Sequence, residues 1–118
     1  MKHETSNFLP LPPASFHILV ALAGDELHGY GIIQEIARQS GGRYRLGPGT
    51  LYDNLQRLML KGLIAETSHR SGTDDDPRRR YYRLTALGSK VLSAEVERLE
   101  GTLREARTHL RALKPRRT

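Results

Sequence analysis

No cysteine and no tryptophan occur among the 118 residues of the sequence. Without cysteine the chain has no disulfide bond, no thiolate nucleophile and no cysteine-based zinc site. Long apolar runs are also missing, since none approaches the roughly 20 residues that a membrane-spanning helix requires. The first residues, MKHETSNFLPLPP, lack the apolar core and the cleavage site of a signal peptide. We therefore expect a cytoplasmic protein that does not associate with membranes.

Signs of catalysis or metal binding are equally scarce. The sequence has no glycine-rich phosphate loop and no nucleophile elbow. Its histidines are scattered, without the spacing of metal ligands, at His3, His17, His28, His69 and His109. We predict no catalytic residue, no metal and no cofactor, and an enzyme is the weakest of the functional hypotheses.

Basic residues are abundant, because 19 Lys and Arg oppose 13 Asp and Glu and give a net charge of +6. The length fits a single domain, and 37% hydrophobic with 27% charged residues indicates a folded globular chain. A small, strongly basic globular protein points to a polyanionic partner.

The first part of the chain predicts an arm followed by two helices. Residues 1–13 read as a loose N-terminal arm because prolines discourage helix there, and Pro13 suits the first position of the next helix. Residues 14–23, ASFHILVALA, are apolar around most of a helix and predict a buried one. Residues 28–40 have apolar positions at helical spacing and end at Gly41-Gly42.

The stretch LGPGTLYDNLQRLMLKGLI predicts a third helix over residues 48–61 that ends at Gly62. Its apolar positions repeat at i, i+4, i+7 and i+8, as expected for one face of a helix, and they are Leu51, Leu55, Leu58 and Met59. Polar side chains gather on roughly the opposite side, and they are Thr50, Asp53, Asn54, Arg57 and Lys61.

Residues 63–68 and 79–84 are predicted strands, joined by the loop 69–78, which contains glycine, proline and three aspartates. In the second strand Arg80, Tyr82 and Leu84 alternate with Arg79, Tyr81 and Arg83. The two tyrosines are interpreted as packing residues. Together the segments predict a long hairpin.

The last helix is predicted over residues 85–114, with Thr85 as its N-cap. Its apolar residues form a heptad seam, and they are Leu92, Val96, Leu99, Leu103, Ala106, Leu110 and Leu113. Such a helix would be roughly 45 Å long, which is more than the rest of the chain can cover. We therefore expect the seam to pair with the same helix of a second chain. A basic tail follows Pro115.

This order of elements predicts a mainly α protein with a small β-hairpin (α+β): a winged helix-turn-helix followed by a long C-terminal dimerisation helix. The expected parts are an arm at 1–13, a DNA-binding domain at 14–84, and the helix with its tail at 85–118. Helix 48–61 is then the recognition helix, because its exposed side chains can reach base edges in a major groove.

Each polar residue of the recognition helix has an expected role. Pro48 and Gly49 begin the helix with little bulk, so that its first N–H groups can approach a phosphate. Thr50, Asn54 and Arg57 offer hydrogen bonds to phosphates and bases, with Asn suited to adenine and Arg to guanine. Lys61 suits a phosphate. Asp53 has two open interpretations, because it can accept from a cytosine amine or restrain Arg57 one turn away.

The hairpin is expected to be the wing, with its arginines on the DNA backbone or in the minor groove. These residues are Arg70, Arg78, Arg79 and Arg80. The three aspartates at 74–76 argue against a phosphate contact at the tip, so the contact is expected on the two stems.

A protein-binding adaptor is the main alternative in a different class. In that case the exposed seam docks another protein and the basic charge is incidental. A helix with one polar face is by itself typical of an ordinary surface helix, and arginine-rich hairpins are commonly only solvated. The combination of elements, rather than any one residue, favours DNA binding.

Four motifs resemble one known family: HGYGIIQEI at 28–36, LGPGTLYDNLQRL at 46–58, KGLI at 61–64 and RRRYYRLTALG at 78–88. They are similar to the PadR family of bacterial transcriptional regulators, and the resemblance covers about residues 14–95. It implies a winged helix domain, a homodimer through the C-terminal helix, and binding to palindromic promoter DNA, usually as a repressor. The resemblance also implies that a small aromatic or drug-like effector, or a cellular signal, alters the spacing of the two DNA-binding heads.

The sequence departs from the family pattern in two places. Asp53 follows the Leu-Tyr pair where proline is common, which affects the expected base contacts. Drug binding against a tryptophan is not carried over, because the chain has no tryptophan.

Gly29 is expected to let its helix start close to a neighbouring helix. His28, Tyr30 and Tyr52 are candidate backbone contacts, with the tyrosine rings packed inward and their hydroxyls on a phosphate or satisfied within the fold.

Overall fold

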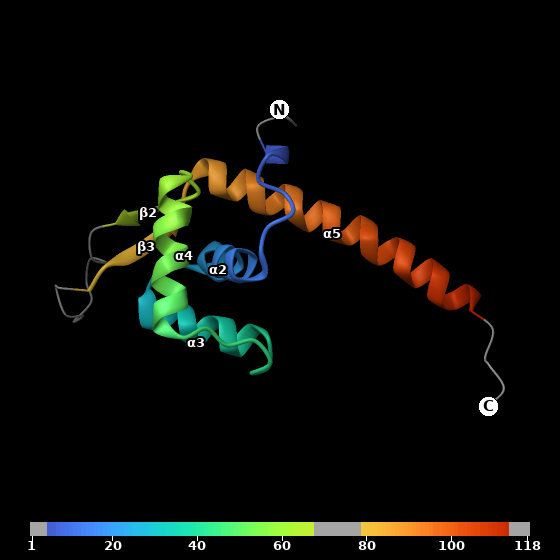
Figure 1. The fold of residues 1–118 in the computed structure, drawn as a ribbon, viewed down its shortest axis with the longest axis horizontal. Coiled ribbons are helices and arrows are strands. Elements are labelled where there is room, and N and C mark those ends of the chain that lie inside the picture. Colours follow the sequence, from blue (N-terminus) through green and yellow to red (C-terminus); the bar gives the residue numbers. More distant parts are fainter. Residues whose placement is uncertain (1–4, 68–78, 114–118) are drawn as a thin grey trace.

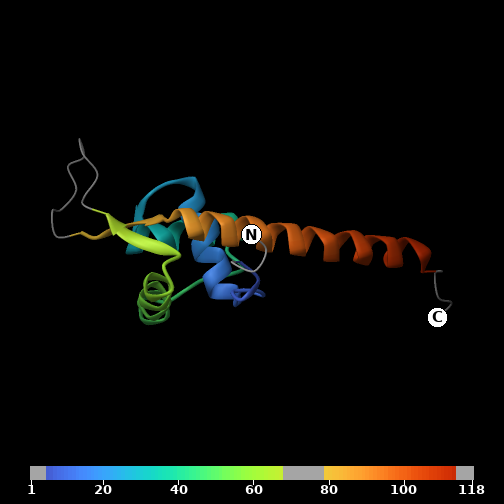
Figure 2. The same ribbon diagram turned by 90° about the horizontal axis from the view of Figure 1, so that it is seen from above.

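The computed structural model describes residues 5–67 and 79–113. The elements occur in the order α2 (Pro13–Gly24), β1 (Leu27–His28), α3 (Gly29–Gln39), α4 (Pro48–Leu60), β2 (Ile64–Thr67), β3 (Tyr81–Leu84) and α5 (Ala86–Ala112). Helices α2, α3 and α4 pack together beside a small sheet, and α5 extends well beyond them (Figures 1 and 2). The predicted helices and strands are confirmed, with ends that differ by at most two residues.

The sheet has three antiparallel strands in the order β1-β3-β2, one more than predicted. Leu27 lies opposite Tyr82, and His28 lies opposite Tyr81. β1 has only two residues, too few for an alternating pattern, and it exists because β3 offers it a partner. This pairing fixes the start of α3 against the base of the wing.

Apolar side chains from every helix and from both wing strands form one core. Its most buried members are Ile18, Leu19, Ile32, Ile36, Leu51, Leu55, Leu58, Leu63, Ile64 and Val91. The prediction that α2 is buried is confirmed. Tyr81 and Tyr82 are both buried, so strand β3 is covered on both faces and the interpretation of these tyrosines as packing residues is confirmed.

Helix α5 is attached to the turn between α4 and β2 through its first residues. The Thr85 hydroxyl accepts from the backbone N–H of Gly88 at 2.9 Å, as predicted for an N-cap, and donates to the carbonyl of Gly62 at 2.6 Å. The N–H of Thr85 donates to the carbonyl of Leu63 at 3.1 Å. A methyl group on Gly88 would overlap the Leu63 carbonyl oxygen, so only glycine allows this close approach.

The N-terminal arm packs on the fold at residues 8–11, which corrects the prediction that the arm is loose. Phe8, Leu9 and Leu11 pack against the core. The backbone N–H of Leu11 donates to Glu95 Oε2 at 2.9 Å. Glu95 is 2% exposed and also accepts from Arg98, at 2.6 Å from Nε and 3.0 Å from Nη2. These arginine hydrogen bonds lower the pKa of Glu95 against the opposing effect of its burial, and the Leu11 N–H lowers it further.

The heptad seam of α5 divides into a buried part and an exposed part. Leu92 belongs to the hydrophobic core of the chain, with 8% exposure, which corrects its assignment to a dimer interface. Leu99 is half-buried. The outer half of α5 lies beyond the other elements (Figure 2). The seam is exposed at Val96 in the first half of the helix, and further out at Leu103, Ala106, Leu110 and Leu113. Across the described ranges, each helix is too short or too polar to cross a membrane.

Candidate nucleic-acid interface

The exposed face of α4 is held in place by its opposite face. Leu51, Leu55 and Leu58 are at most 2% exposed, and they fix the rotation of the helix. Pro48 is the first helical residue, and Gly47 is the N-cap. Since glycine has no side chain that can accept from the first-turn N–H groups, this helix end can approach an external acceptor. Pro48, Gly49 and Thr50 are all exposed there, as expected.

Asp53, Arg57 and Lys61 are also exposed on α4. Within residues 5–67 and 79–113, the side chains of Asp53 and Arg57 form no hydrogen bond or ion pair. The structure therefore does not support the interpretation in which Asp53 restrains Arg57. Both side chains point outward with their charges uncompensated by the described part of the fold.

Asn54 does not belong to this exposed face, and its expected role as a base contact is corrected. Its side chain is 8% exposed, and its Nδ2 donates to the carbonyl of Thr50 at 2.8 Å. At about 100° per residue, Asn54 lies only about 40° around the helix from Leu58. The amide is therefore at the edge of the apolar face, where a backbone carbonyl satisfies it.

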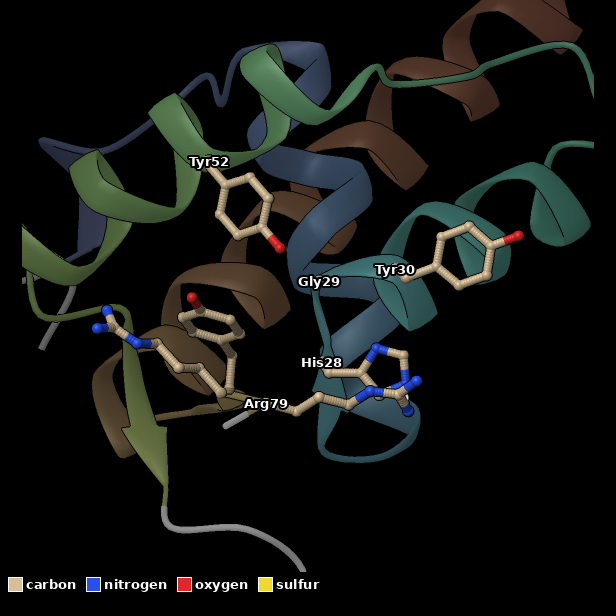
Figure 3. Close-up of a pocket in the computed structure, with 7 residues that line it drawn as sticks. His28, Gly29, Tyr30, Tyr52 and Arg79 are labelled. Atoms are coloured by element: carbon tan, nitrogen blue, oxygen red, sulfur yellow. Dashed lines mark hydrogen bonds between the residues drawn. The ribbon is translucent and has the colours of Figure 1, made fainter. Parts of the chain in front are cut away.

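Helix α3 begins beside Tyr52 of α4. His28 is its N-cap, and His28 Nδ1 accepts from the N–H of Gly31 at 3.1 Å. A methyl group on Gly29 would overlap the Tyr52 hydroxyl and lie 2.8 Å from Cζ. The expectation that Gly29 allows close approach is thus confirmed. Tyr30 and Tyr52 are 64% and 51% exposed, so the prediction that both rings pack inward is wrong, although the Tyr52 hydroxyl points toward Gly29 (Figure 3).

A cavity of about 310 Å³ lies between the start of α3, the Tyr52 side of α4 and the base of the wing (Figure 3). It is lined by His28, Gly29, Tyr30, Tyr52, Arg79, Arg80 and Tyr82. Five of these seven residues come from the sites expected in the sequence, and the structure brings them together from three elements. Burial raises the pKa of Tyr82, with a further contribution from Glu66, so its hydroxyl stays protonated and able to donate.

The electrostatics of this cavity favour an anion. Arg79 Nη1 lies 3.4 Å from His28 Nε2. Nδ1 of the same ring accepts from the N–H of Gly31, and in that tautomer Nε2 carries the hydrogen and can donate beside the Arg79 guanidinium. Arg80 lies 3.2 Å from Glu66 in an ion pair whose side chains are 73% and 42% exposed, and such a pair is easily exchanged for another partner. The positive end of the α3 dipole adds to this field.

The structure does not describe two of the expected wing residues, and two exposed residues of α4 were not identified from the sequence. Arg70 and Arg78 of the wing lie outside the described residues. Sequence reasoning missed Gln56 and Leu60, which are exposed on α4, Leu60 at 83%. A helical wheel centred on Leu51, Leu55 and Leu58 would have found them.

In the described ranges no three His, Asp or Glu side chains come together in a way that could hold a metal ion.

A helix-turn-helix followed by a hairpin, here β2 and β3 of the three-stranded sheet, defines a winged helix-turn-helix protein. Residues 18–94 match the model of the transcriptional regulator PadR-like family. The chain belongs to this family, whose members are transcriptional regulators rather than enzymes.

Three relatives illustrate this membership. The transcriptional regulator Rv3488 of Mycobacterium tuberculosis is 38% identical over 89 residues, which span 75% of this chain and 78% of that protein. A PadR family regulator from Clostridium difficile superposes with a TM-score of 0.67 and 27% identity, covering 84% of this chain and 99% of that one. Bacillus subtilis PadR, whose structure is a complex with operator DNA, gives a TM-score of 0.61 and 25% identity, covering 74% of this chain and 48% of that one.

Proposed function

We propose that this transcriptional regulator binds double-stranded DNA as a homodimer and represses a promoter with a palindromic site. The observation that carries the proposal is the exposed face of α4, on which the open N-terminus, Thr50 and Arg57 lie together. A major groove about 12 Å wide admits one helix. In this arrangement each α4 enters the groove of one half-site.

The α4 residues divide into groups that position the helix and groups that distinguish bases. The N–H groups behind Pro48 and Gly49 bind a phosphate, which fixes the helix end on the backbone. Thr50 contacts the backbone or a base edge. Arg57 is free to bond the O6 and N7 atoms of guanine. Lys61, at the other end of the helix, binds a phosphate.

The cavity beside α4 would bind the flanking DNA backbone. His28, Tyr30 and Tyr52 supply neutral donors, and Arg79 and Arg80 supply positive charge. A phosphate oxygen carries negative charge and accepts hydrogen bonds, so it complements these donors and cations. Contact at the base of the wing agrees with the expectation that its stems, rather than its tip, approach DNA.

Dimerisation would use the exposed seam of α5. Leu103, Leu110 and Leu113 are 48%, 66% and 68% exposed on a helix half that the rest of the subunit leaves uncovered. Pairing with a second α5 removes these side chains from water. The pair would then hold two α4 helices about 34–36 Å apart, the spacing of one DNA turn.

Similarity to Bacillus subtilis PadR, which was solved on operator DNA, supports the proposal. The protein-binding adaptor remains the alternative, because an exposed apolar seam also suits a different protein. The two hypotheses differ in what they require of α4. DNA binding requires Arg57, whereas an adaptor that docks through α5 does not.

Fluorescence anisotropy at about 150 mM salt tests the proposal with duplex from upstream of the encoding gene and with a scrambled duplex. We expect a preference of about 10³-fold or more for the specific duplex. Arg57→Ala should cost about 1–3 kcal/mol on the specific duplex and less on the scrambled one. Arg104→Ala, which removes the same charge from the exposed outer part of α5, is the matched control.

Equal loss on both duplexes after Arg57→Ala would refute the base contact. If no upstream or genomic duplex is preferred over scrambled DNA, the proposed function is wrong and the adaptor hypothesis replaces it.

A further inference from the structure

Asp53 points more directly away from the core than any other charged residue of α4. The buried stripe is centred on Leu51, Leu55 and Leu58. At about 100° per residue, Asp53 lies about 170° around the helix from the centre of this stripe, and Arg57 about 130°. The Asp53 carboxylate is therefore part of the surface that the exposed face of α4 presents to a partner.

The carboxylate is poorly suited to a general DNA-binding surface. It is exposed, and within the described ranges it has no cationic or hydrogen-bond partner. A negative charge on a helix that approaches DNA is repelled by the phosphates. The repulsion is offset only where the carboxylate accepts a hydrogen bond from a base, since an ionised carboxylate can only accept.

The bases differ in what they offer to such a group. In the major groove guanine presents two acceptors, and thymine presents an acceptor and a methyl group. Adenine presents its amine beside the N7 acceptor, which repels the second carboxylate oxygen. Cytosine presents its N4 amine without an acceptor on the same edge. The chemistry of Asp53 therefore selects cytosine.

We propose that the Asp53 carboxylate accepts a hydrogen bond from a cytosine amine in the major groove and so determines one base pair of each half-site. This inference rests on the proposed function. Asp53 and Arg57 are four residues apart, or about 6 Å along the helix. Arg57 is therefore placed to contact guanine at a neighbouring base pair. In the same major groove Asp53 then favours cytosine and Arg57 favours guanine.

Selection from a library of random duplexes tests the proposal without knowledge of the operator. Wild type, Asp53→Asn and Asp53→Ala are compared, and Glu97→Gln on the exposed side of α5 controls for the loss of one negative charge. Asp53 is exposed and makes no contact that folding needs, so both variants are expected to fold, which circular dichroism checks.

Wild type and Glu97→Gln should enrich cytosine at one fixed position per half-site, and replacing it should weaken binding about five- to tenfold. Asp53→Ala should tolerate all four bases at that position and leave the rest of the selected site unchanged. Asp53→Asn should shift the preference at that position to adenine, which suits an amide.

Two outcomes overturn the inference, and they differ in what else they affect. If wild type and Asp53→Ala select the same site with the same preferences, the cytosine contact is wrong while the proposed function stands. If wild type selects no site at all, the proposed function fails, and the role of Asp53 fails with it.

Discussion

Replacing Glu95 by glutamine is expected to destabilise the folded chain by about 1.5–3 kcal/mol, the usual cost of losing one buried hydrogen bond to a charged group. Glu95 is 2% exposed and is the point where the N-terminal arm meets α5, through the N–H of Leu11 at 2.9 Å. Glutamine has nearly the same shape, so it leaves no cavity. Its amide, however, has only one oxygen for the donors of Leu11 and Arg98.

The magnitude follows from which bond is lost. If the glutamine oxygen accepts from Leu11, its NH₂ group faces the Arg98 guanidinium, and two donors oppose each other. The Arg98 side chain is 41% exposed, so water can satisfy the guanidinium, but the glutamine NH₂ group stays buried without an acceptor. If the oxygen instead accepts from Arg98, the Leu11 N–H loses its buried acceptor. Either arrangement forfeits about one strong hydrogen bond.

The pH dependence gives the prediction a second test. Hydrogen bonds from Arg98 hold the pKa of Glu95 below its usual range, so the folded state binds the Glu95 proton less tightly than the unfolded state. Stability from the carboxylate is then fully present above the unfolded pKa of about 4.3, and it is lost as the pH falls through the lower folded pKa. The difference between wild type and Glu95→Gln should therefore be full at pH 7 and shrink below about pH 4.

Urea unfolding followed by circular dichroism, at fixed protein concentration, measures this difference. Glu97→Gln is the matched control, because Glu97 is exposed two residues further along the same helix. That variant should stay within about 0.5 kcal/mol of wild type. A Glu95→Gln protein as stable as the control, or a loss that does not change with pH, would refute the role of Glu95 as the attachment point of the arm.

The two remaining predictions concern α5. Gly88→Ala should destabilise the fold by about 2 kcal/mol or more in urea, because its methyl overlaps the Leu63 carbonyl. The methyl group of Gly101→Ala, in the same helix, would meet no described atom closer than 4.0 Å, so this control variant should stabilise the fold by up to about 1 kcal/mol. Equal effects of the two substitutions on stability would contradict the close contact between Gly88 and Leu63. Leu103→Lys combined with Leu110→Lys should give monomers in sedimentation, whereas Leu60→Lys, also exposed, should not. A double variant that remains dimeric would exclude this seam as the interface.

Periodicity made the helices predictable. The apolar repeat of residues 51–59 identified α4 because each of those positions, apart from the half-buried Met59, is in the core. The N-cap at Thr85 was also foreseeable, since threonine precedes the start of the last helix. Such features depend on neighbours within a few residues, which the sequence displays directly.

Features that depend on distant partners were not predictable. Strand β1 has two residues and exists only through its pairing with β3. Asn54 looked like part of the polar face because its type is polar, but its position on the helix is at the edge of the core. Glu95 resembled any charged residue of a long helix, and only the fold shows that the arm returns to it. The cavity lined by His28, Tyr52 and Arg79 likewise required three elements to meet.

The attachment of α5 has a mechanical consequence. Thr85 bonds to the carbonyls of Gly62 and Leu63, and Gly88 lies directly against the latter, so the first turn of α5 is joined to the chain that leaves α4. Helix α4 cannot rotate relative to the first turn of α5 without breaking these contacts. Each subunit therefore behaves as a stiff lever, with α4 at one end and the exposed seam at the other. If two chains pair through α5 as proposed, a small change in the angle between the two α5 helices is multiplied into a larger change in the distance between the two α4 helices.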